Sequence, residues 1–123
     1  MPKERPEVLA GETIRAKTEY GYLYLTINCF KGEAFEVRIQ LGKSGNFVRS
    51  LLEHIGIMYS ILLQSDLPKA EIIRILEKHC VGVSDNNPFF YKGISYKSCI
   101  DFIARKVLEK LKDVQDGEKA QRA

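Results

Sequence analysis

Two segments in the first third of the chain alternate between apolar and polar residues, as half-buried β-strands do. In residues 22–30, Leu23, Leu25 and Ile27 share one face, and residues 35–41 alternate in the same way. Residues 13–19 show a weaker alternation, and a short loop containing Gly32 separates the two clear segments. The sequence therefore predicts an antiparallel three-stranded meander with one apolar face.

The period changes at residue 46, where apolar residues begin to recur at helical spacing and continue to residue 64. Further apolar residues widen the apolar arc beyond one stripe. A helix that is apolar on most sides lies either inside a large core or against another subunit. Because a domain this small has few elements to surround such a helix, we expect the chain to form a homo-oligomer through the 46–64 helix.

Two further helices are predicted in the second half of the chain. Pro68 suits the first turn of a helix that runs to about His79. Residues 81–96 have no regular period, and Ser98 and Asp101 form a capping box at the start of the last helix. The predicted fold class is therefore α+β, an antiparallel three-stranded meander packed against a long apolar helix and two further helices. Residues 1–12 are expected to be a flexible N-terminal lead-in, 13–112 a single domain and 113–123 a frayed C-terminal tail.

Composition restricts the possible functions. The 123 residues are 45% hydrophobic and 28% charged, which is typical of a globular domain that folds without disulfides or metal. The net charge of +3 is too mild to indicate duplex nucleic-acid binding. Residues 1–7 do not resemble a signal peptide, and the apolar run at 55–63 is too short for a membrane span. We expect a cytoplasmic protein with no membrane partner.

The cysteines and histidines do not form a recognisable metal or catalytic pattern. Cys29, Cys80 and Cys99 are widely spaced, and His54 and His79 do not complete a zinc spacing. No acidic cluster suits a two-metal site, and His54 and Cys80 carry no nucleophile signature. We therefore expect no catalytic residue, no metal and no cofactor. The cysteines are interpreted as reduced structural residues, although a redox pairing is left open.

Three places could contact an anionic ligand. The turn Gly42-Lys43-Ser44-Gly45 precedes a helix N-terminus, where free N–H groups and the helix dipole attract phosphate. It lacks Walker A spacing, and an ordinary glycine-rich turn would explain it equally. The loop at 86–91 places Asn87 beside Phe89 and Phe90, which could hold a purine or ribose or could fill the core below. Arg105 could clamp a phosphate or be a solvated helix residue. The candidate ligand-binding residues are Lys43, Ser44, Asn87, Phe89, Phe90 and Arg105.

With these elements placed, the chain resembles the TSCPD family over roughly residues 20–111. The matching pieces are the strand entering Gly42-Lys43-Ser44-Gly45, the helix segment Leu52-Glu53-His54-Ile55-Gly56, residues 71–80, and Ser98-Cys99-Ile100-Asp101 with the four residues after it. The family signature reads Thr-Ser-Cys-Pro-Asp; here Lys97 replaces the Thr and Ile100 the Pro. The resemblance implies a domain found at the C-terminus of adenosylcobalamin-dependent ribonucleotide reductases and in small free-standing proteins.

Two functions follow as hypotheses. The first is a non-catalytic protein that binds a small anionic nucleotide. Its size and layout are similar to those of phage anti-defence sponges of the Thoeris-inhibitor kind, which sequester a cyclic nucleotide signal of the cyclic ADP-ribose type or a cyclic oligonucleotide, in the host cytoplasm if phage-encoded. The alternative is an accessory module associated with ribonucleotide reductase, in which Cys99 would matter.

Overall fold

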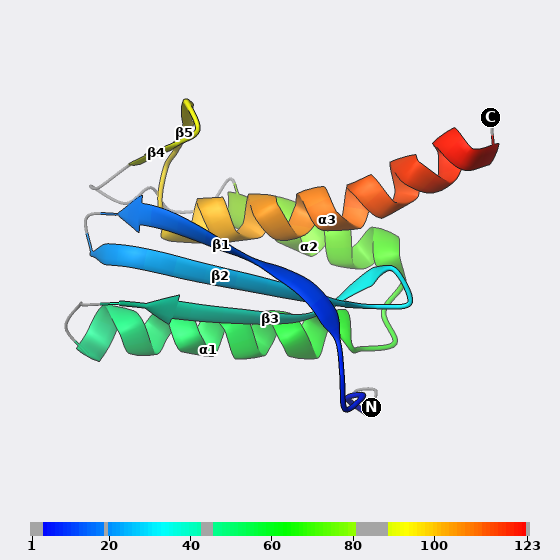
Figure 1. Ribbon diagram of the computed structural model, residues 1–123, viewed down its shortest axis with the longest axis horizontal. Helices are drawn as coiled ribbons and strands as arrows, with labels where there is room; N and C mark the ends of the chain where they lie inside the picture. The colour runs from blue at the N-terminus through cyan, green and yellow to red at the C-terminus, as the bar shows by residue number, and fades with distance from the viewer. Residues whose placement is uncertain (1–3, 19, 43–45, 81–88, 123) are drawn as a thin grey trace.

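The computed structural model describes the backbone of residues 4–18, 20–42, 46–80 and 89–122, and their side chains apart from those of residues 46, 89 and 113–122. The strands lead into the helices, with one short hairpin between the last two helices (Figure 1). The elements are β1 (Ala10–Thr18), β2 (Gly21–Phe30), β3 (Glu33–Leu41), α1 (Asn46–Leu63), α2 (Lys69–Cys80), β4 (Phe89–Tyr91), β5 (Ile94–Tyr96) and α3 (Cys99–Arg122).

The first three strands form the predicted antiparallel meander, in the order β1-β2-β3. Leu25 of β2 lies between Ile14 of β1 and Ile39 of β3, so the apolar residues of all three strands share one face. β1 begins at Ala10, three residues before the expected start of the strand. The α+β class and the three-helix layout are confirmed.

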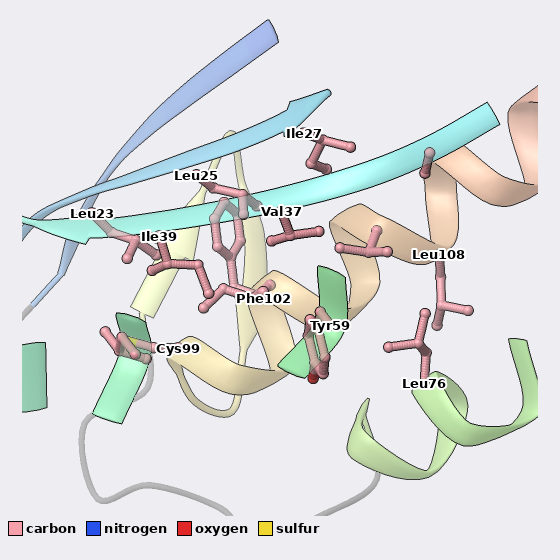
Figure 2. Packing of buried hydrophobic residues seen from close by; sticks show 14 of the residues in the cluster. Leu23, Leu25, Ile27, Val37, Ile39, Tyr59, Leu76, Cys99, Phe102 and Leu108 are labelled. Carbon is pink, nitrogen blue, oxygen red and sulfur yellow. The ribbon is translucent and has the colours of Figure 1, made fainter. Parts of the chain in front are cut away.

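The apolar face of the sheet packs on α3, and α2 packs on α3 in turn. Phe102, Ile103 and Val107 of α3 are fully buried, as is Leu76 of α2. Figure 2 shows side chains of β2 and β3 pointing onto Phe102. This layer of aliphatic and aromatic contacts is the core predicted from the alternating strands and the helical spacing after Asp101.

Helix α1 lies along the open edge of β3 (Figure 1). Ser60 Oγ accepts a hydrogen bond from Val37 N at 2.9 Å and donates to Val37 O at 3.0 Å. Gln64 Nε2 donates to Phe35 O at 3.1 Å. A Cβ on Gly56 would lie 3.3 Å from Val37 O, so the absence of a side chain there allows the close approach. Side chains of α1 thus satisfy backbone groups that an edge strand leaves unpaired.

The structure corrects two expectations about the elements. α1, which was expected to be apolar on most sides, is 18 residues long and turns Gly56 and the polar Ser60 toward the backbone of β3. The segment expected to be irregular contains the β4–β5 hairpin, whose turn places Lys92 at φ 50° and Gly93 at φ 80°. The α3 backbone stays helical beyond Lys112 to Arg122; fraying of the tail stays a prediction.

Candidate functional site

The residues that match the family signature begin α3 and cap it. Ser98 Oγ accepts a hydrogen bond from Asp101 N at 3.1 Å. Asp101 Oδ2 accepts from Lys97 N at 2.9 Å, and its Oδ1 accepts from Arg105 Nε at 2.7 Å. Asp101 is 2% exposed. The predicted capping box is therefore present, and the carboxylate has an additional ion-pair partner one turn along the helix.

Arg105 lies in this cap network. Its side chain is 44% exposed, and its guanidinium carbon is 5.8 Å from the centre of the Tyr96 ring. The hydrogen bond to Asp101 raises the pKa of Arg105 further above its ordinary value. The cap therefore uses one N–H of the guanidinium, and a ligand role for Arg105 stays a prediction.

The other predicted ligand residues are only partly visible. Lys43, Ser44 and Asn87 lie outside the described residues, as does the side chain of Phe89. Phe90 lies in β4 and is 72% exposed. Among the described side chains, the structure brings none of the predicted set together with another, and their ligand roles stay predictions.

A polar cavity of about 240 Å³ lies where β1, the β4–β5 hairpin and α3 meet. Lys106 Nζ is 5.3 Å and Lys92 Nζ 5.5 Å from the centre of the Tyr91 ring, in the range of cation–π contact. Lys110, one turn beyond Lys106, lines the same cavity. Two ammonium groups thus lie beside one aromatic ring, and a third lysine lines the same cavity. The complete lining is Glu12, Ile14, Ile27, Tyr91, Lys92, Lys106, Glu109 and Lys110.

Two carboxylates partly balance these lysines. Lys110 Nζ is 2.5 Å from Glu12 Oε1, and Lys106 Nζ is 3.3 Å from Glu109 Oε2. The Lys106 side chain is only 14% exposed. Burial alone would lower the pKa of Lys106, but Glu109 and Tyr96 outweigh that effect and raise it. Lys106 therefore stays cationic, and the cavity has a formal charge of +1 from three lysines and two glutamates.

These lysines were not among the predicted site residues. Lys106 and Lys110 are four residues apart and so share a helix face, which the sequence alone could have indicated. Lys92 reaches them because the hairpin folds back toward β1. Three-residue strands are too short to show a period, and so no sequence pattern indicates that Tyr91 and Lys92 lie beside α3.

A second cavity, apolar and about 290 Å³, lies between α1 and the start of α3. Ser98, Cys99 and Ile100 form one wall of it, so the residues at the family signature face this groove. Its complete lining is Tyr20, Val48, Leu51, Leu52, Ile55, Ser98, Cys99 and Ile100. An apolar groove of this kind suits an apolar side chain better than a charged ligand.

The cysteines are separate in the structure. Cys29, Cys80 and Cys99 form no disulfide, and Cys99 is 5% exposed. Burial raises the pKa of the Cys29 and Cys80 thiols above their usual value, which lowers the fraction of reactive thiolate. Within the described part of the chain, no group of three or more potential metal ligands occurs, and no helix there is long and apolar enough to cross a membrane.

Comparison with known proteins adds one finding to this geometry. No curated protein and no solved structure matches the chain. The family model described as "TSCPD domain" matches residues 1–112, which include the sheet, α1, α2, the hairpin and the capped start of α3. With nearly the whole chain matched, this protein belongs to the TSCPD domain family.

Proposed function

We propose that this TSCPD protein binds an anionic nucleotide, and that its phosphate lies in the cavity between β1, the β4–β5 hairpin and α3. The observation that carries the proposal is the placement of Lys92, Lys106 and Lys110 around that cavity, two of them beside the Tyr91 ring. Ammonium groups bind phosphate as point charges, and an aromatic edge or face beside them suits a sugar or base.

The carboxylates in the cavity do not prevent phosphate binding. Glu12 and Glu109 have side chains that are 54% and 53% exposed. The Lys110–Glu12 pair is partly exposed on both sides, and an exposed ion pair contributes only about 0–1 kcal/mol. A phosphate with more than one negative charge can therefore compete with the exposed glutamates for Lys110 and for the more buried Lys106. Because the cavity is about 240 Å³, it has room for a phosphate and part of a ribose rather than a whole dinucleotide. We expect the base to lie at its mouth.

The ligand class that we propose is a cyclic nucleotide signal, of the cyclic ADP-ribose type or a cyclic oligonucleotide. We infer sequestration rather than turnover because the described lysine cavity contains no paired nucleophile and base. Mass spectrometry of the ligand after binding and release tests this point directly. A ligand that returns unchanged supports sequestration, and a ligand that returns cleaved or rearranged makes the protein an enzyme.

The chain contains a matched pair of lysines for the binding test. Lys92 and Lys31 each precede a glycine in a hairpin turn, at φ 50° and 53°, and each lies over an aromatic ring at 5.5 and 5.3 Å. Asn tolerates this left-handed conformation, so Lys→Asn removes the charge and keeps the turn. Only Lys92 lines the cavity.

Isothermal titration with cyclic ADP-ribose isomers and cyclic dinucleotides would compare the wild type with Lys92→Asn and Lys31→Asn. We expect Lys92→Asn to weaken binding by about fivefold or more, equivalent to about 1 kcal/mol, and Lys31→Asn to leave it unchanged. Equal weakening in both variants would indicate a general effect of charge and would refute the placement of the phosphate in this cavity. Absence of binding to every one of these nucleotides would refute the proposal.

A second candidate is an accessory module of ribonucleotide reductase. The family match supports it, since TSCPD domains are associated with these enzymes. Cys99 lines the apolar groove at the start of α3, where a partner could reach the groove wall. Co-purification with a reductase and a deoxynucleotide-production assay on Cys99→Ser would test it. Full activity of that variant would contradict a thiol role, and failure to co-purify would contradict the association.

A further inference from the structure

Helix α1 has a second apolar side that faces away from β3. Phe47, Leu51, His54, Met58 and Ile61 follow one another at intervals of four, three, four and three residues. Phe47 is 75% exposed, Leu51 49%, Met58 64% and Ile61 55%. This set is called the α1 stripe below. Nothing in the described part of the chain covers it.

The spacing of the α1 stripe is that of a helix–helix seam. Alternating steps of three and four residues give a mean period of 3.5, which keeps a line of side chains facing a partner helix along several turns. The buried side of α1 shows a different pattern, with Leu52, Gly56 and Ser60 at steps of four. One helix thus carries two separate contact faces, one used within the chain and one exposed.

We propose that the α1 stripe packs against the α1 stripe of a second copy of this chain, forming a symmetric dimer. The two helices run antiparallel, with His54 at the two-fold axis. His54 lies at the middle of the stripe, seven residues from both Phe47 and Ile61. An antiparallel pair would place Phe47 of each chain beside Ile61 of the other, and Leu51 near Met58.

Charge supports a copy of the same chain as the partner. The positions that flank a seam of this register are 48, 50, 55, 57, 62 and 64, and these are Val, Ser, Ile, Ile, Leu and Gln. In helix seams the flanking charges select the partner. Here no formal charge lies at the flanks, so two copies of a chain with net charge +3 can meet without like-charge contacts at the seam.

The exposed apolar area also supports a dimer. The four apolar stripe residues and the neighbouring Ile57, which is 56% exposed, each present on the order of 100 Å². Their sum, about 500 Å² per chain, is most of the ~800 Å² that each partner buries in an interface of standard size. Leu51 also lines the apolar groove beside Ile100, so the patch continues from α1 onto the start of α3.

Native mass spectrometry and sedimentation velocity on the full chain, between 1 and 100 μM, test the proposal. We expect a dimer for the wild type. Met58→Glu places a carboxylate in the seam and should raise the dimer dissociation constant by 100-fold or more. Gln40→Glu makes the same charge change at an exposed position of β3 and should leave the dimer intact. Because Met58 is 64% exposed, the Met58→Glu chain should still fold. Its circular dichroism spectrum should match that of the wild type, and it should melt cooperatively as a monomer.

Two results would overturn the dimer. One is a monomeric wild type at 100 μM, which would assign the α1 stripe to a different partner. The other is a Met58→Glu variant that dimerises as tightly as Gln40→Glu. Orientation has its own test: a mixture of Phe47→Cys and Ile61→Cys chains should cross-link under oxidation while Phe47→Cys alone should not. Cross-linking of Phe47→Cys with itself would show a parallel pair instead.

The dimer and the nucleotide cavity stand on different residues. Met58→Glu should not alter nucleotide binding in the lysine cavity, and Lys92→Asn should not alter the oligomeric state. Each proposal can therefore fail without the other.

Discussion

Ser60 is the residue at which the contact between α1 and the sheet can be measured most directly. Its hydroxyl oxygen accepts a hydrogen bond from Val37 N at 2.9 Å. Its O–H group is shared as a donor by Val37 O and Gly56 O, each at 3.0 Å. Ser60→Ala removes these bonds but leaves α1 lying over the edge of β3. The Val37 N–H and C=O then lose their partner in a place that the helix shields from water.

The expected cost follows from these two groups. A buried donor or acceptor left without a partner costs about 1–3 kcal/mol. Gly56 O can also accept a hydrogen bond within α1, so its loss of the Ser60 hydroxyl is not counted. Because the edge is only partly buried, we expect the two unpaired Val37 groups together to cost about 2–3 kcal/mol. Alanine returns about 0.5 kcal/mol through its higher helix propensity. The net prediction is a loss of about 2 kcal/mol in the free energy of unfolding, equivalent to about 8 °C in melting temperature for a domain of this size.

Urea unfolding at one fixed protein concentration measures this loss, because the stability of a dimer depends on concentration. Ser50→Ala is the control, since Ser50 is an exposed residue of the same helix. It should change the free energy of unfolding by less than about 0.5 kcal/mol. If Ser60→Ala were as stable as Ser50→Ala, the side-chain bonds to β3 would not contribute to stability and the explanation of the edge would be refuted.

Three further predictions concern the same scaffold. A Gly→Ala change inside a helix normally stabilises a protein by about 1 kcal/mol. Gly56→Ala should not, because its Cβ would lie 3.3 Å from Val37 O and 3.4 Å from Ile39 N. A clear rise in melting temperature would contradict this. Glu36→Gln should cost about 1–2 kcal/mol at pH 7 in urea unfolding. The hydrogen bond from Arg5 lowers the pKa of Glu36, so its contribution is present above the unfolded pKa of about 4.3 and disappears as the pH falls through the folded pKa; the difference between wild type and variant should close in acid. Asp101→Ala should lower thermal stability by about 2 kcal/mol, because it removes the acceptor of Lys97 N and the partner of Arg105; an unchanged melting temperature would show that the cap contributes little.

The elements with a long and clean period were predictable from sequence. Residues 22–30 of β2 and 35–41 of β3 alternate in sequence, and Leu23, Leu25 and Ile39 are buried as their positions in the alternation require. The start of α3 was also predictable, because Ser98 and Asp101 form a local motif that needs no distant partner. In both cases the residues that determine the element are local, so the strand alternation and the helix cap can be recognised without knowing the tertiary contacts.

The contact between α1 and β3 could not be predicted in this way. In the sequence, Gly56 and Ser60 look like interruptions of an apolar helix. Their role depends on which strand has an open edge and on which side of it the following helix lies, and both depend on tertiary packing. The lysine cavity was missed for the same reason, since Lys92 and Lys106 come together only when the hairpin lies against α3.

The geometry at the start of α3 also explains how the chain keeps its family fold with an altered signature. The two signature positions whose side chains form the cap, Ser98 and Asp101, are both retained, as is Cys99 between them. Lys97 takes part in the cap through its backbone N–H, which any residue except proline supplies, and Ile100 is 38% exposed at the groove wall. The substitutions therefore fall where the helix cap places no demand on the side chain. It follows that Ser98 and Asp101 maintain the cap of α3, whereas Ile100 alters the lining of the apolar groove.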